Sequence, residues 1–262
     1  MEILKNFVAN RDLVFRLSIN DFKNRFAGSY LGIVWAFIQP VISVLIYWFV
    51  FEVGFKSAPI KDFPFVLWLI AGIVPWFFFS EALMSATNGL LEYSYLVKKV
   101  VFNINIIPVI KIVSAMFVHF FFVGFTMILF IGYKVPMSIH WFQIIYYSIC
   151  TICLVSAISY ITASLIVFMR DIGQIINIML QIGMWLTPIM WSYDIMPDLY
   201  RNIIKLNPMY YIVEGYRDSL INQIWFWERP YQTMNFWLIV GSLMMIGIYT
   251  FKKLKPHFAD VL

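Results

Sequence analysis

Formal charge and reactive side chains are scarce in this sequence. Asp, Glu, Lys and Arg together make up 13% of the 262 residues, and there are three His and two Cys residues. A typical soluble protein is about one quarter charged and about half apolar, whereas this chain is 62% hydrophobic. A water-soluble core of this size cannot bury so many apolar side chains, so the composition predicts a polytopic membrane protein. The net charge of +5 is spread among the apolar segments and gives no support for binding nucleic acid.

Sequence motifs of enzyme active sites are also missing. There is no Gly-x-x-x-x-Gly-Lys-Ser/Thr phosphate-binding loop, so we expect that this chain does not hydrolyse ATP itself. Cys150 and Cys153 form a Cys-x-x-Cys pair, but their apolar surroundings without a nearby acid or base are typical of packing residues. A membrane-embedded glycosyl- or acyltransferase should cluster Asp, Glu or His at a membrane face, and here they are scattered. We predict no catalytic residue, metal or cofactor in this chain.

Two titratable residues lie inside predicted spans and are candidates for function for that reason. Glu81 is either part of a gate or ion site or, in the ordinary interpretation, a carboxylate at the membrane interface or paired across helices. His119 is either bonded to a neighbouring helix or part of a proton relay. No series of acids in register accompanies them, which argues against a proton-driven transporter.

The first thirty residues are charged and predict an amphipathic helix rather than a cleaved signal peptide. Between residues 4 and 26, apolar side chains recur at helical spacing and basic ones lie on other faces, which is typical of a helix in the membrane interface. The apolar positions are Phe15, Ile19, Phe22 and Phe26, and the basic ones include Arg11, Lys23 and Arg25. Gly28 and Ser29 allow a bend before the first span.

The apolar runs predict an all-α polytopic fold with six transmembrane helices in a single domain over residues 1–262. The predicted spans are residues 31–53, 65–84, 112–133, 141–169, 172–191 and 235–251. Residues 88–105, with Lys98 and Lys99, predict a short cytoplasmic helix, and Lys252, Lys253 and Lys255 place the C-terminus on the same side. Residues 192–233 then lie outside and contain two short helices, which either lie flat on the surface or enter the membrane and return.

Aromatic side chains make up 19% of the chain. Packing against lipid and an interfacial belt are their ordinary roles. Several lie too deep in the spans for a simple belt, and aromatic faces stack on sugar rings, so the alternative is that some of them line a conduit. The candidates are Trp35, Tyr47, Trp76, Phe77, Phe78 and Trp185.

An ordered series of short motifs runs through the whole chain. They are Arg25-Phe26, Ser29 to Ala36 with Pro40, Pro75 to Ser80, Arg170-Asp171-Ile172, Thr187-Pro188-Ile189, Asn207-Pro208, Phe251-Lys252-Lys253 and Phe258-Ala259-Asp260. With this series the chain resembles the permease subunit of type-2 ABC exporters for cell-surface polysaccharides such as O-antigen, capsule and teichoic acid.

The resemblance implies a homodimer in the bacterial cytoplasmic (inner) membrane, with both termini cytoplasmic, that binds two copies of a separate ATPase subunit holding ATP and Mg²⁺. It implies that residues 88–105 form the coupling helix on that ATPase, with Glu92, Tyr95, Lys98 and Lys99 as contact residues. Residues 1–30 would form a gate helix whose Arg25, Lys23 and Arg16 attract the diphosphate of a lipid-linked glycan. Residues 192–233 would be re-entrant, and spans one and five would border a lateral opening for the lipid.

A type-2 ABC exporter of drugs or other small hydrophobic molecules remains an alternative, because it shares the predicted fold and also lacks its own ATPase. The basic amphipathic N-terminal helix and the aromatic content favour glycan export. The identity of the glycan is open at this stage.

Overall fold

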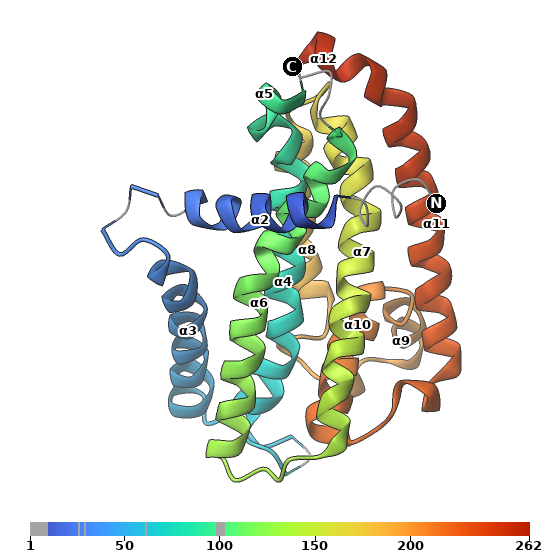
Figure 1. Ribbon diagram of the computed structural model, residues 1–262. Coiled ribbons are helices and arrows are strands. Elements are labelled where there is room, and N and C mark those ends of the chain that lie inside the picture. The colour runs from blue at the N-terminus through green and yellow to red at the C-terminus, as the bar shows by residue number, and fades with distance from the viewer. Residues whose placement is uncertain (1–9, 26, 29, 61, 98–102) are drawn as a thin grey trace.

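The computed structural model describes all residues except 1–9, 26, 29, 61 and 98–102 (Figure 1). Its elements are helices, which confirms the predicted all-α fold. Within the described residues, five helices are long and apolar enough to cross a membrane. They are α3 (Val34–Trp48, continued to Gly54 by a π-helical turn), α4 (Phe65–Glu92), α6 (Ile107–Gly132), α7 (Gln143–Ile166) and α11 (Pro230–Leu254).

The fifth predicted span is shorter than the sequence suggested. Helix α8 (Ile172–Leu186) has 15 residues, or about 22 Å at 1.5 Å per residue, against about 30 Å of hydrocarbon. It ends because Thr187 adopts an extended conformation and Pro188 follows, so the predicted end at residue 191 is wrong. The second span is longer than predicted, since α4 continues from residue 84 to Glu92.

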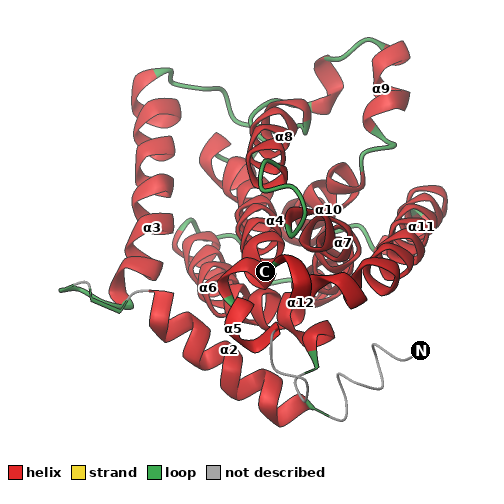
Figure 2. Ribbon diagram, turned by 90° about the horizontal axis from the view of Figure 1, so that it is seen from above, coloured by secondary structure: helices red, strands yellow, loops and turns green. Residues whose placement is uncertain are grey.

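Helix α4 is the centre of the bundle. It is apolar around most of its circumference, and 83% of its most apolar window is buried. A helix that is apolar on all sides is expected to be enclosed by other helices. Helices α6, α7, α8 and α10 (Pro208–Arg217) all pack on it, as Figure 2 shows from above.

Helix α3 stands at the edge of the molecule, apart from the α4–α6–α7 core (Figure 2). Only 11% of its apolar window is buried. Helix α8 has no buried residue at all, although its sequence is apolar. These two helices therefore present large apolar surfaces that need a lipid or protein environment.

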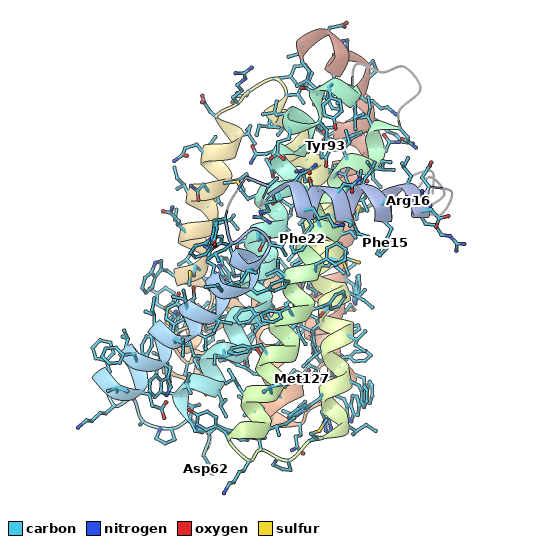
Figure 3. All side chains as sticks on the ribbon, turned by 60° about the vertical axis from the view of Figure 1, so that its left-hand side comes forward. Phe15, Arg16, Phe22, Asp62, Tyr93 and Met127 are labelled. Atoms are coloured by element: carbon cyan, nitrogen blue, oxygen red, sulfur yellow. The ribbon has the colours of Figure 1, made fainter. Side chains whose placement is uncertain are left out.

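The amphipathic N-terminal helix is α2 (Arg11–Arg25), which crosses the bundle at a steep angle to its axis (Figures 1 and 3). Val14, Ser18 and Phe22 form its buried face against α6, and the Ser18 hydroxyl donates to the Ile110 carbonyl at 3.1 Å. The apolar face predicted from Phe15 and Phe22 is thus rotated toward Val14, and Phe15 is 54% exposed. Phe26 lies outside the described residues.

The segment between α8 and α11 enters the bundle at α10. Residues Met209–Val213 and Gly215–Ile221 are buried on α4, α7 and α11, and a π-helical turn continues the helix to Asn222. Helix α9 (Asp198–Ile204) lies at the periphery (Figure 2), with Tyr200 and Ile203 exposed. Of the two predicted short helices, the second is therefore the one enclosed by the spans.

The predicted helix over residues 88–105 is not one continuous helix. Its first residues belong to α4, a turn at Tyr93 leads to α5 (Ser94–Val97), and a 3-10 turn at Ile104–Ile106 precedes α6. Lys98 and Lys99 lie outside the described residues. Helix α5 shares an end of the bundle with the C-terminal helix α12 (Phe258–Val261), and Val97 packs with Phe251 and Phe258 there (Figure 1).

Candidate functional site

A cavity of about 530 Å³ lies between α3, α4, α6 and α8. Its wall contains Trp76, Phe77 and Phe78 of α4 and Phe122 of α6. Polar side chains enter it from α3 and α8, and Arg25 lies at the end of α2 that reaches it. The cavity is therefore amphiphilic, with an aromatic wall on the bundle side and hydrogen-bonding groups on the two peripheral helices.

A second cavity of about 480 Å³ adjoins the first toward the C-terminal end of α4. Arg25, Met84 and Ser85 line both cavities. The second is more polar and contains Asp21 and Lys111. Together the two cavities extend along α4 from the middle of the bundle to the α5 end.

A stripe of polar residues on α4 connects the two cavities. Glu81, Ser85, Asn88 and Glu92 follow one another at intervals of four, three and four residues, which places them on one face of the helix. Apart from Ser80 and Thr87, the rest of α4 is apolar, so these four residues form a polar stripe along an otherwise apolar helix.

Glu81 is paired with Arg25 by an ion pair between α4 and α2. The ordinary interpretation of Glu81, a carboxylate paired across helices, is therefore confirmed. The Arg25 side chain is 40% exposed and Glu81 is 25% exposed. Arg16 and Lys23, the other predicted head-group residues, are exposed on α2 and do not line either cavity.

Lys111 joins three elements at the second cavity. Its ammonium group donates to Asp21 of α2 at 2.7 Å and to Glu92 of α4, while Tyr93 donates its hydroxyl to Asp21 at 2.8 Å (Figure 3 labels Tyr93 beside α2). The Lys111 side chain is only 7% exposed. Burial raises the pKa of the Tyr93 hydroxyl, and the Asp21 carboxylate raises it further, so the phenol keeps its proton and acts as a donor.

The predicted aromatic residues fall into two groups. Trp76, Phe77 and Phe78 line the first cavity, and the Trp76 indole packs where α8 has Gly183, since a Cβ there would lie 2.9 Å from the ring. The other three do not line either cavity. Trp35 and Trp185 are 43% and 68% exposed, and Tyr47 packs at the edge of the core.

Two of the predicted ATPase-contact residues, Glu92 and Tyr95, line the second cavity at the α5 end. Tyr95 is 59% exposed. Glu92 is held by Lys111, so this end of α4 is tied to α2 through one lysine.

Arg217 is an important residue that sequence reasoning missed. It is fully buried, and its guanidinium donates to the carbonyls of Pro188 at 2.6 Å and Ile189 at 2.8 Å and to Glu214 at 2.6 Å. It also lies over the Trp68 ring. A signal was present, because Glu214 and Arg217 are a charged pair one helical turn apart in an apolar segment.

The Thr187-Pro188 and Asn207-Pro208 motifs meet in this region. The Asn207 side chain donates to the Thr187 hydroxyl at 3.0 Å and accepts from the Met209 amide at 2.9 Å, which caps α10. Asn207 thus fixes the end of α8 to the start of α10, and Arg217 fixes the residues that follow α8 to the last turn of α10. The cavity wall supplied by α8 is thus positioned by α10.

His119 is bonded to other helices, as the ordinary interpretation predicted. Its Nε2 lies 3.0 Å from the Ser148 hydroxyl and 3.1 Å from the Tyr216 hydroxyl, and its ring stacks on Phe78. Among the described residues, no three His, Cys, Asp or Glu side chains lie close enough together to hold a metal ion.

The fold and the cavities define a polytopic membrane protein whose spans enclose an amphiphilic cavity. The chain belongs to the ABC-2 type transporter family, whose model matches residues 12–221, as the motif series predicted. It is 27% identical over 257 residues to an O-antigen export system permease protein RfbA of Klebsiella pneumoniae, with 96% of this chain and 95% of the relative covered. A protein of the same name from Myxococcus xanthus is 24% identical over 221 residues, with 83% of each chain covered.

Proposed function

We propose that this chain is the membrane-spanning subunit of an ATP-driven exporter for a lipid-linked polysaccharide, an O-antigen or a similar glycan. The observation that carries the proposal is the amphiphilic cavity between α3, α4, α6 and α8. Aromatic rings pack on the apolar faces of sugars, and amides and hydroxyls form hydrogen bonds with the sugar hydroxyl groups. The names of the relatives agree with this assignment.

The energy for export comes from a separate cytoplasmic ATPase, which binds ATP and Mg²⁺. We infer that the ATPase binds at the α5 end of the bundle, where Arg170, Lys252 and Lys253 are exposed and mark the cytoplasmic side. Both termini lie on that side, and the protein resides in the bacterial inner membrane. Of the predicted contact residues, the structure describes Glu92 and Tyr95, and both lie at this end.

The exporter is a homodimer with two ATPase copies. The exposed apolar surfaces of α3 and α8 are what a second copy and the surrounding lipid would cover. The cavity lies between these same two helices and α4, so a lipid tail can stay in the bilayer while its glycan occupies the cavity. A long glycan cannot be held whole in a cavity of about 530 Å³, which favours stepwise movement of the chain.

Arg25 is the proposed contact for the diphosphate of the lipid carrier. It lies at the junction of the two cavities, where its guanidinium already binds the Glu81 carboxylate. A diphosphate is a stronger partner for a guanidinium than one carboxylate is, so the incoming carrier would exchange with Glu81.

The test is a deletion strain complemented with this chain, together with co-purification of the ATPase encoded for the same system. We expect surface glycan to return only when both subunits are present, and lipid-linked glycan to stimulate ATP hydrolysis by the purified complex. Stimulation by hydrophobic drugs with no response to lipid-linked glycan would support the small-molecule exporter and contradict the proposal.

A further inference from the structure

The two peripheral helices present matched pairs of uncharged polar side chains to the first cavity. Gln39 and Ser43 line it from α3, and Asn177 and Gln181 line it from α8. Each pair is separated by four residues, which places its members one above the other on the same face of the helix. The two pairs therefore form short polar ladders on the walls of one cavity.

The side-chain amides of these ladders have no hydrogen-bond partner within the described part of the chain. The side chains of Gln39, Asn177 and Gln181 form no hydrogen bond to another described residue. The Ser43 hydroxyl donates to the backbone carbonyl of Gln39 at 3.0 Å, so it does not bind the Gln39 side chain. An amide that faces hydrocarbon without a partner is unfavourable. These side chains need an occupant of the cavity that both donates and accepts hydrogen bonds.

The charges of the residues that line the cavity indicate which chemical class of occupant fits it. Among the residues that line the first cavity, formal charges are carried only by Arg25 and Glu81, which neutralise each other at one end. The remainder of the described wall is amide, hydroxyl, aromatic, aliphatic and thioether, together with the His119 imidazole, which bonds to Ser148 and Tyr216. Away from Arg25, a wall of this kind complements a hydroxyl-rich chain without charge, and it offers no further cation to a polyphosphate or a uronic acid chain.

We propose that Gln39, Ser43, Asn177 and Gln181 are the residues that contact the sugar hydroxyls of the cargo, and that they make the cavity selective for an uncharged glycan segment over an anionic one. This inference rests on the proposed function and adds the contact residues and the charge class of the glycan. Trp76 and Phe77 supply the apolar wall behind the chain.

Photo-cross-linking tests the contact directly. A benzophenone amino acid is placed at Gln39, Asn177 or Gln181. Met179 is the control, because it is exposed on the opposite face of α8 and does not line the cavity. Cells that synthesise a neutral lipid-linked glycan are illuminated, and the permease is probed with a glycan stain. We expect permease–glycan adducts at the three cavity positions and none at position 179.

Leucine substitutions test the energetic role. Gln181→Leu with Asn177→Leu should reduce export of a neutral glycan by about tenfold, the effect of losing roughly two hydrogen bonds, whereas Met179→Leu on the opposite face of α8 should leave export unchanged. Leu is favoured over Gln in a membrane helix, so poor insertion would not explain the loss. In the purified complex, a neutral lipid-linked glycan should stimulate ATP hydrolysis more than an anionic one of the same length.

Three results would overturn the inference. One is equal adduct formation at positions 179 and 181. A second is permease–permease cross-links in place of glycan adducts, which would assign the ladders to the contact between two copies. The third is equal stimulation by neutral and anionic glycans. If instead the unaltered chain supports no export with its ATPase, the proposed function itself fails, so the two failures are distinguishable.

Discussion

The Arg217 guanidinium lies over the indole of Trp68, with its central carbon 3.4 Å from the ring centroid. Gly72, one turn along α4 from Trp68, makes room for it, because a Cβ at position 72 would lie 2.8 Å from a guanidinium nitrogen. The same guanidinium binds the carbonyls of Pro188 and Ile189 after α8. One side chain of α10 therefore links α4 to the end of the helix that lines the cavity.

Removing Arg217 should destabilise this junction strongly. Arg217→Met leaves Glu214 and two carbonyls without their buried partner, and breaking a buried ion pair in this way costs roughly 3–5 kcal/mol. We expect a lower melting temperature in detergent and loss of export. Arg217→Lys should recover only part of the stability, because an ammonium group cannot reproduce the planar stacking on Trp68. A melting temperature unchanged in both variants would contradict the proposed linking role.

Gly215 should tolerate no side chain. A Cβ there would lie 2.1 Å from the Tyr147 ring, so Gly215→Ala forces α10 away from α7 and should cost about 1–3 kcal/mol despite the better helix propensity of Ala. Gly124→Ala is the matched control, since nothing lies within 4 Å of a Cβ at that position of α6. Thermal unfolding of both variants measures the difference, and equal melting temperatures would show that α10 is not packed on α7 as described.

The architecture follows from the sequence where apolar periodicity and length decide it. The positions of α4, α6, α7 and α11 were predictable, because each is an apolar run long enough to span. The extension of α4 to Glu92 was not, because its polar stripe resembles the end of a span and is stabilised by Arg25 and Lys111 from other helices. Ion pairs between distant helices cannot be recognised from the local hydropathy of the sequence.

The site was predictable only in part for the same reason. The Pro-Trp-Phe-Phe motif suggested that Trp76, Phe77 and Phe78 line a conduit, and these residues do line the cavity. Trp35 and Trp185 also lie in apolar segments, but they are exposed on the peripheral helices α3 and α8. Arg217 was assigned to an external segment, because a buried cation is recognisable only after the carbonyls and the ring that surround it are placed together.

Exchanging the charges of the Arg25–Glu81 pair tests whether Arg25 only bridges two helices or also contacts the head group of the lipid carrier. Arg25→Glu should abolish export through repulsion with Glu81, and the double variant Arg25→Glu with Glu81→Arg restores the pair with its charges exchanged. We expect the double variant to recover stability but not export, because the cation no longer lies at the end of α2. Melting temperature and surface glycan are measured on the same cells. Full recovery of export would show that Arg25 has only a structural role and does not contact the head group.

Lys111 should hold α2 against the bundle. Lys111→Met leaves the Asp21 and Glu92 carboxylates together without their cation, so α2 should separate from α6. The measurement is maleimide labelling of Ser18→Cys, a fully buried position of α2, in a background with Cys150 and Cys153 replaced by Ala. Labelling should be slow with Lys111 or with Lys111→Arg and fast with Lys111→Met. Equally slow labelling in all three would show that α2 is held by its apolar face alone.

ATP-dependent movement of the glycan through this subunit is the central claim, and one measurement tests it most directly. Proteoliposomes that contain the chain and its partner ATPase are supplied with lipid-linked glycan on the ATPase side, and the glycan that reaches the opposite leaflet is quantified with an impermeant probe. We expect translocation with ATP and Mg²⁺, and none with a non-hydrolysable ATP analogue or with vesicles that lack the chain. Equal translocation with and without ATP hydrolysis would contradict the claim.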